Sequence, residues 1–299
     1  MAGFADRLIE ATRARGTPLC VGIDPHLDLI PGRFRRGAMT PGDAATTETV
    51  RDFCFALLER LPGKVAVIKP QAAFFELLGP DGMVVLADLS REAMALGLMV
   101  VMDAKRGDIG STSTAYARAW LGPEAGFASD ALTINPFLGI DTLEPFITTA
   151  AERGAGLFIL TRTSNPGSAD IQGITAEDGR PVFHHLANRL NPLMEAHLGR
   201  HGFSDLGVVA GATWPEEAAL LRRLMPSALF LVPGFGAQGG GAAEALAGFV
   251  DGPEGREGGI VNSSRGISFP EDAADAGSDA DWRQAIDNAL ERSNAALRG

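Results

Sequence analysis

The chain has 299 residues, of which 45% are hydrophobic and 21% are charged, and this composition is typical of a protein with a packed core. Its two cysteines, Cys20 and Cys54, are too few for a disulfide scaffold. The net charge of −11 argues against nucleic acid or an anionic membrane as the main partner. The first residues lack the apolar core of a signal peptide and no apolar run reaches the length of a membrane span, so we expect a cytoplasmic protein.

Short apolar runs recur along the chain, and most are followed by a segment in which apolar residues have helical spacing. The predicted strands cover residues 19–24, 65–69, 98–103, 131–135, 156–161, 207–210, 229–232 and 259–262. The predicted helices cover residues 46–60, 83–96, 112–121, 143–153, 184–198, 216–225, 242–249 and 281–297. Because continuous apolar runs suit parallel strands buried on both faces, this alternation predicts an α/β protein with a (β/α)8 TIM barrel. A doubly wound open sheet is the competing architecture.

The chain contains no internal sequence repeat, and we expect a single domain over residues 1–299. Three segments rich in Gly, Pro and polar residues, near residues 31–45, 165–183 and 251–257, are predicted loop insertions. The second and third follow the fifth and seventh predicted strands. This order would place both at the catalytic end of a barrel.

The sharpest motif follows the third predicted strand, where Asp103, Lys105 and Asp108 stand within six residues. Residues two apart at a strand end point to the same side, so Asp103 and Lys105 are expected to meet. Lys64, Lys69 and Lys105 are the only lysines among 26 basic residues. An ammonium can release a proton whereas a guanidinium stays charged, which favours a chemical role for a retained lysine. Coding bias is the alternative explanation for the small number of lysines. A structural salt bridge at the strand end is the alternative explanation for the Asp103 and Lys105 motif.

A glycine-rich segment follows the seventh predicted strand, and Gly234, Gly236 and Gly239 match G-x-G-x-x-G. A dinucleotide fingerprint normally opens its nucleotide-binding unit, so its position here argues against that interpretation. Exposed backbone N–H groups in such a segment suit an anion. Arg265 follows the eighth strand, and the loops after strands seven and eight are the usual phosphate site of a βα barrel. A solvent-exposed arginine in a capping turn is the alternative.

Other strand ends also carry polar groups. Asp24 ends the first predicted strand, Lys69 ends the second and Ser164 follows the fifth. Each alone would more often be part of a structural turn, but together they converge on one end of the barrel. The five histidines show no ligand spacing near strand ends, so we expect no metal site.

Asp103-x-Lys105-x-x-Asp108-Ile109, followed by Thr112, resembles the signature of the orotidine 5′-phosphate decarboxylase family, in its longer bacterial subgroup. Ser164, the segment Pro233-Gly-x-Gly-Ala-Gln238 and Arg265 occur in the family's order. The resemblance extends from Asp24 to Arg265. It implies decarboxylation of orotidine 5′-monophosphate (OMP) to uridine 5′-monophosphate (UMP) and CO2 in de novo pyrimidine biosynthesis, without a cofactor.

The resemblance also implies residue roles. Lys105 would protonate C6 of the pyrimidine, and Asp103 would sit beside the substrate carboxylate and hold Lys105. Asp24 and Lys69 would bind ribose hydroxyls, with Lys69 completing an alternating charge network. Ser164 and Pro233 would contact the nucleotide, while Gly236, Gln238 and Arg265 would bind its phosphate. Asp108 and Thr112 would enter the active site of the other subunit of a homodimer.

Three other functions stay open at this point. The nearest is a sugar-phosphate decarboxylase or aldolase of the same superfamily. A Schiff-base aldolase would use Lys105 as its nucleophile, although two nearby acids favour the charged amine. A non-catalytic barrel that binds a phosphate-bearing ligand is the third.

Overall fold

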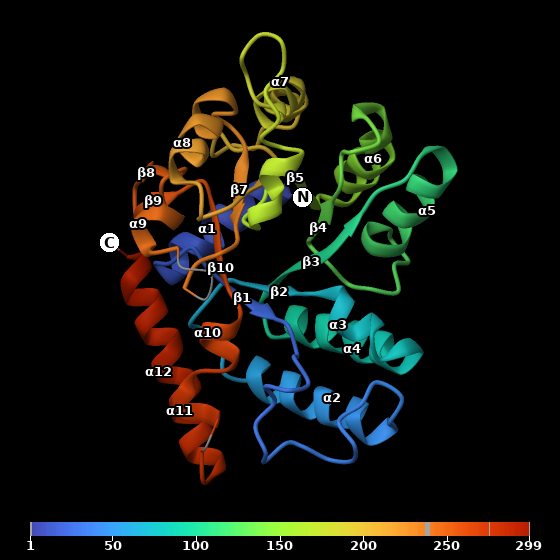
Figure 1. Cartoon of the computed structure of the whole chain (residues 1–299), viewed down its shortest axis with the longest axis vertical. Helices are drawn as coiled ribbons and strands as arrows, with labels where there is room; N and C mark the ends of the chain where they lie inside the picture. The colour runs from blue at the N-terminus through green and yellow to red at the C-terminus, as the bar shows by residue number, and fades with distance from the viewer. Residues whose placement is uncertain (1, 237–239, 275, 299) are drawn as a thin grey trace.

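The computed structural model describes residues 2–236, 240–274 and 276–298. Within these residues, eight parallel strands form a closed barrel in the order β1-β10-β7-β6-β5-β4-β3-β2 (Figure 1). The barrel strands are β1 (Leu19–Ile23), β2 (Val67–Pro70), β3 (Met99–Arg106), β4 (Ala131–Ile134), β5 (Gly156–Arg162), β6 (Leu206–Ala210), β7 (Leu229–Val232) and β10 (Gly259–Ser263). Each overlaps a predicted strand. The predicted (β/α)8 barrel is therefore confirmed, and closure excludes the open sheet.

Helices surround the strands (Figure 1). Those that match predicted helices are α2 (Ala44–Leu58), α4 (Gly79–Ala95), α5 (Gly110–Leu121), α6 (Glu144–Arg153), α7 (Val182–Glu195), α8 (Pro215–Leu224), α9 (Ala242–Ala245) and α12 (Asp279–Leu297). The additional helices are α1 (Phe4–Arg15), α3 (Ala72–Glu76), α10 (Arg265–Ser268) and α11 (Glu271–Ala274), with 3₁₀ turns η1 (Ile140–Leu143) and η2 (Pro166–Asp170). The prediction for residues 242–249 was too long, because α9 ends at Ala245 and the chain then turns toward a hairpin.

Local chemistry sets several helix ends. Asp43 caps α2 by accepting a hydrogen bond from the Ala45 N–H, and Ser278 caps α12 by accepting one from the Asp281 N–H. Gly16 ends α1 and Gly154 ends α6, both in the left-handed conformation that glycine adopts at low cost. These signals explain why the predicted and observed helices differ by only a few residues at most ends.

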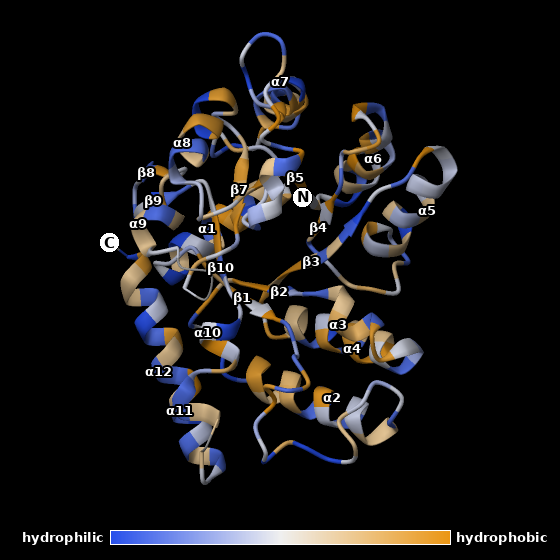
Figure 2. Cartoon of the chain, in the orientation of Figure 1, coloured by the Kyte–Doolittle hydropathy of each residue, from blue (hydrophilic) through white to orange (hydrophobic). Residues whose placement is uncertain are grey.

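Two apolar clusters stabilise the barrel. The larger fills the space between the strands and the surrounding helices. The smaller lies inside the barrel, and α1 contributes Phe4 and Leu8 to it. The Phe4 ring meets Phe158 edge to face at a centroid separation of 5.9 Å. Figure 2 shows that β3 changes from hydrophobic to hydrophilic along its length, so its carboxyl end leaves the apolar core.

One predicted loop has a different structure and position. Residues 251–257 form most of an antiparallel hairpin, with β8 at Val250–Gly252 and β9 at Gly255–Glu257. Glu257 accepts a hydrogen bond from Arg13 of α1 at 2.8 Å. The prediction that this segment lies at the catalytic end is wrong, because α9 first carries the chain back to the amino-terminal end of the barrel. The 165–183 segment does line the cavity at the carboxyl ends of the strands.

Among the helices of the described residues, none combines the length and apolar character that crossing a bilayer requires. The division into one domain is not tested by these features and stays a prediction.

Candidate active site

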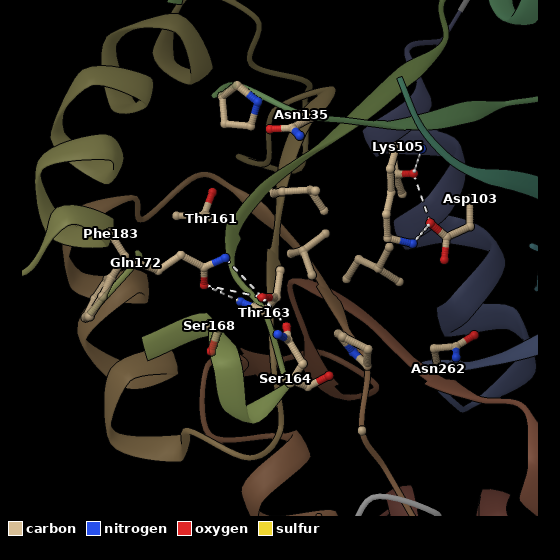
Figure 3. A pocket seen from close by; sticks show the side chains of 18 of the residues that line it. Asp103, Lys105, Asn135, Thr161, Thr163, Ser164, Ser168, Gln172, Phe183 and Asn262 are labelled. Atoms are coloured by element: carbon tan, nitrogen blue, oxygen red, sulfur yellow. Dashed lines mark hydrogen bonds and ion pairs between the residues drawn. The ribbon is translucent and has the colours of Figure 1, made fainter. Parts of the chain in front are cut away.

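A cavity of about 1300 Å³ opens at the carboxyl ends of the barrel strands (Figure 3). Predicted site residues that line it are Asp24, Lys69, Asp103, Lys105, Ser164, Pro233 and Arg265. Among the described residues, the predicted Asp108, Thr112 and Gly236 are not part of this lining. Gln238 lies outside the residues that the structure describes. The structure thus brings together polar groups from β1, β2, β3 and the loops after β5, β7 and β10.

The period of two along a strand explains which side chains enter the cavity. Lys69 and Gln71 line it from β2 and the residue after it, and Asp103 and Lys105 line it from β3. Thr133 of β4 lines it as well. Alternate residues of these strands therefore face inward, whereas their neighbours pack against the helices.

Asp103 lies at the centre of a buried hydrogen-bond network. Its Oδ1 accepts hydrogen bonds from the Lys105 ammonium at 2.5 Å and from the Thr133 hydroxyl at 3.0 Å. Its Oδ2 accepts from the Lys69 ammonium at 2.6 Å and from the Gln71 amide at 3.1 Å. Four donors thus hold one carboxylate, which fixes both its orientation and the positions of the two ammonium groups.

The electrostatics of this network favour its charged form. Burial alone would raise the pKa of Asp103, but Lys69 and Lys105 outweigh burial and hold that pKa well below its usual value. Burial alone would lower the pKa of Lys69, but Asp103 and Asp24 outweigh it and raise that pKa. Asp103 and Lys69 are only 6% and 4% exposed, so water screens their attraction weakly.

The backbone at Lys105 departs from regular strand geometry. Its φ is +49°, in the left-handed region that costs a non-glycine residue about 1 kcal/mol or more. The strand register also shifts between Met102 and Arg106. The Lys105 N–H donates a hydrogen bond to the Thr133 hydroxyl at 2.9 Å, so Thr133 holds both this backbone and Asp103. The predicted meeting of Asp103 and Lys105 is confirmed, but through an irregularity within β3 at which the Lys105 backbone is strained.

Two buried oxygens in the cavity lack partners among the described residues. They are Oδ1 of Asp24 and Oδ1 of Asn262, and both residues line the cavity. The Asn262 amide donates a hydrogen bond to the Ser264 hydroxyl at 3.2 Å, which leaves its carbonyl oxygen free to accept. A buried acceptor without a partner is costly, so both oxygens are suited to ligand groups that donate hydrogen bonds.

Ser164 also lines the cavity, at a distance from Lys105 (Figure 3). Neighbouring residues fix the chain on both sides of it. The Thr163 N–H donates to the Gln172 side-chain oxygen at 2.9 Å, and the Thr213 hydroxyl donates to the Ser164 carbonyl oxygen at 3.1 Å. These contacts leave the Ser164 side chain at the cavity surface.

The predicted anion site is present in part. Arg265 is exposed, begins α10 and lines the cavity together with Gly234. Gly234 and Gly236 have φ values of +99° and +75°, which glycine adopts readily. Because β7 is a strand of a closed barrel, the dinucleotide interpretation of this segment is wrong.

Asp108 and Thr112 lie beyond the end of β3, at the start of α5. Thr112 is exposed, and one Asp108 carboxylate oxygen accepts a hydrogen bond from the Ile109 N–H at 2.8 Å. Neither residue reaches the cavity of its own chain.

The closed barrel and the charged array define a protein of the (β/α)8 class whose cavity holds lysine and carboxylate groups in fixed positions. A sequence profile described as "Orotidine 5'-phosphate decarboxylase / HUMPS family" matches residues 17–280, and the chain belongs to this family. The chain is 40% identical to the orotidine 5′-phosphate decarboxylase of Rhodopirellula baltica over the full length of both. It is 40% identical to that of Deinococcus radiodurans over 89% of each chain. The Leishmania donovani OMP decarboxylase structure superposes with a TM-score of 0.73 at 33% identity, covering 99% of each chain.

Sequence reasoning missed Gln71, Thr133 and Asn262. All three line the cavity, and the first two are Asp103 hydrogen-bond donors. The period of two from Lys69 would have pointed to Gln71. Thr133 and Asn262 sit at the ends of correctly predicted strands, but neither carries a charge that draws attention.

Proposed function

We propose that the chain decarboxylates OMP to UMP and CO2 in pyrimidine biosynthesis, with Lys105 as the proton donor. The observation that carries this proposal is the Lys69–Asp103–Lys105 array, in which one buried carboxylate holds two ammonium groups at 2.5 and 2.6 Å. Family membership and the curated relatives support the same reaction.

The array suits the chemistry of the reaction. Breaking the bond between C6 and the carboxylate leaves an electron pair on C6 that is orthogonal to the ring π-system, so resonance stabilises it little. The Lys105 ammonium stabilises that charge and then gives its proton to C6, which yields UMP and a neutral amine that solvent reprotonates. A substrate carboxylate about 4 Å from Asp103 would be repelled by about 4 kcal/mol at an effective dielectric constant of 20. That repulsion disappears with CO2.

The other cavity residues suit the rest of the nucleotide. Asp24 and Lys69 bind the ribose hydroxyls, and the buried Oδ1 of Asp24, which has no hydrogen-bond partner in the described part of the chain, supports this assignment. Ser164 hydrogen-bonds the pyrimidine edge, and Pro233 packs against the nucleotide. Arg265 binds the phosphate with two parallel hydrogen bonds, together with backbone N–H groups of the glycine segment. Roles for Gly236 and Gln238 in phosphate binding stay predictions.

A homodimer accounts for Asp108 and Thr112. Their neighbour Ile109 is 63% exposed, and Phe137, in the loop after β4, is 74% exposed. Such apolar exposure near a cavity is typical of a subunit interface. We therefore propose that Asp108 and Thr112 enter the partner's active site. Mixing inactive Lys105→Ala with inactive Asp108→Ala chains should restore part of the activity, because a hybrid dimer holds one intact site. No recovery after verified subunit exchange would contradict this arrangement.

A substrate comparison tests the reaction against its rivals. We expect turnover of OMP in the presence of EDTA and none of sugar phosphates that lack a base. Turnover of a sugar phosphate that EDTA abolishes would favour the sugar-phosphate alternative, and borohydride trapping of substrate on Lys105 would favour the Schiff-base alternative. Unchanged OMP after long incubation would favour the non-catalytic barrel. The cytoplasmic location stays a prediction.

A further inference from the structure

A buried arginine directly precedes the segment that carries Ser164. Arg162 is the last residue of β5 and is only 3% exposed. It is not among the described residues that line the cavity. A guanidinium taken out of water is costly unless partners satisfy it, so its burial requires an explanation.

The Arg162 guanidinium connects three elements. Its Nη1 donates a hydrogen bond to the Ser168 hydroxyl in η2 at 2.6 Å, and its Nε donates to Glu217 of α8. Its Cζ lies 4.2 Å from the ring centroid of Trp214, just before α8. The planar fork of arginine can make these contacts together, whereas a lysine ammonium cannot.

The same residues before α8 also hold the backbone of the Ser164 segment. The Trp214 indole N–H donates to the Thr163 carbonyl oxygen at 3.2 Å, and the Thr213 hydroxyl donates to the Ser164 carbonyl oxygen at 3.1 Å. A Cβ built on Gly211 would lie only 2.7 Å from the Ser164 Cα, so the residue after β6 is in close contact with this segment. The Arg162 guanidinium packs on the Trp214 ring, and the Trp214 indole N–H in turn holds the Thr163 carbonyl oxygen.

We infer that Arg162 is a positioning residue that, with Glu217 and Trp214, sets the place of Ser164 in the cavity. This inference rests on the proposed function, in which Ser164 contacts the pyrimidine. Loss of the Arg162 contacts would let η2 and the Ser164 segment shift, while Arg265, which begins α10 after the last barrel strand, would keep its place. The effect is therefore specific to the base portion of the ligand.

Competitive inhibition of OMP turnover by two compounds tests this specificity. UMP contains the base, and ribose 5-phosphate lacks it. For Arg162→Met we expect the Ki of UMP to rise about tenfold and that of ribose 5-phosphate to change by less than about twofold, since a small misplacement of a binding group has effects of this size or larger. In a Ser164→Ala background, Arg162→Met should raise the UMP Ki by no more than about twofold, because the two residues act as one unit.

Arg222 provides the matched control. It is also a buried arginine, lies 4.1 Å from the Phe230 ring centroid and donates hydrogen bonds to backbone carbonyls, but it is not among the described residues that line the cavity. Arg222→Met should lower the melting temperature and leave the ratio of the two Ki values unchanged. If Arg162→Met acted only by destabilising the fold, it too would lower the melting temperature and leave the ratio of the two Ki values unchanged.

The possible results separate the hypotheses. If the wild-type chain does not turn over OMP, the proposed function is wrong and the inference falls with it. If it does, and Arg162→Met changes both Ki values equally or neither, only the positioning role is wrong. Should Arg162→Met fail to fold, Glu217→Gln replaces it. A rise confined to UMP supports the role, and an unchanged ratio overturns it.

Discussion

Replacing Asp103 with asparagine tests the buried charge network, because the change keeps the side-chain shape and removes the charge. At 2.6 Å and an effective dielectric constant of 20, the attraction between Lys69 and Asp103 is about 6 kcal/mol. Desolvation offsets part of it, but breaking a buried pair from one side costs about 3 to 5 kcal/mol, since the other charge stays buried. We expect Asp103→Asn to lower the free energy of unfolding at pH 7 by about 3 to 5 kcal/mol. In the variant, burial would no longer be opposed by Asp103, and the pKa of Lys69 would fall.

Urea unfolding at pH 7 and near pH 3 measures this effect and its sign. The folded pKa of Asp103 lies below the unfolded value of about 3.9, so its contribution is present above that pH and declines as the pH falls. The difference between wild type and Asp103→Asn should therefore shrink in acid. Asp287→Asn is the matched control, because Asp287 also contacts two cations, Arg60 and Lys64, but at a more exposed site. We expect it to cost about 1 kcal/mol or less. Equal losses of unfolding free energy in Asp103→Asn and Asp287→Asn would refute the reasoning. So would a difference between wild type and Asp103→Asn that stays the same at both pH values.

Further predictions concern other parts of the molecule. Arg222→Met should lower the free energy of unfolding by about 3 kcal/mol, measured by urea unfolding, because it leaves buried carbonyls without donors. A loss below 1 kcal/mol would contradict that ~3 kcal/mol estimate. Burial raises the pKa of Cys20 to about 12 and also raises that of Cys54, so neither thiol should react with an aromatic disulfide reagent at pH 8 until urea unfolds the chain. Fast labelling of the native protein would argue against this burial. Thr133→Val should reduce kcat about tenfold, since one hydroxyl holds both Asp103 and the Lys105 backbone, whereas Thr133→Ser should stay close to wild type. Equal kcat values in the two variants would show that the hydroxyl is not needed.

The fold could be predicted from the sequence because its signals are local. Apolar runs marked all eight barrel strands, and Lys69 and Lys105 were identified from the rarity of lysine and their places at strand ends. Lys64 shows the limit of that argument, because it pairs with Asp287 outside the cavity. Period-two alternation placed Asp103 and Lys105 on one side, as observed.

Features that depend on tertiary contacts could not be predicted in this way. The left-handed backbone at Lys105 is held by Thr133 of the neighbouring strand, and sequence separation hides that contact. The hairpin at residues 250–257 was assigned to the wrong end because its place was inferred from the strand it follows, although the helix predicted at residues 242–249 lies between the two. Arg162 lies just after the strand predicted at residues 156–161, and nothing in the sequence marks it, since its partner Glu217 is 55 residues away.

The most direct test of the central claim is the ultraviolet absorbance of OMP incubated with the wild-type chain, Lys105→Ala and Lys64→Ala. We expect the spectrum to change steadily to that of UMP with the wild type and with Lys64→Ala, because Lys64 lies outside the cavity. Folded Lys105→Ala should leave the OMP spectrum unchanged, since the proton donor is lost. Substantial turnover by Lys105→Ala, or none by the folded wild type, would contradict the account.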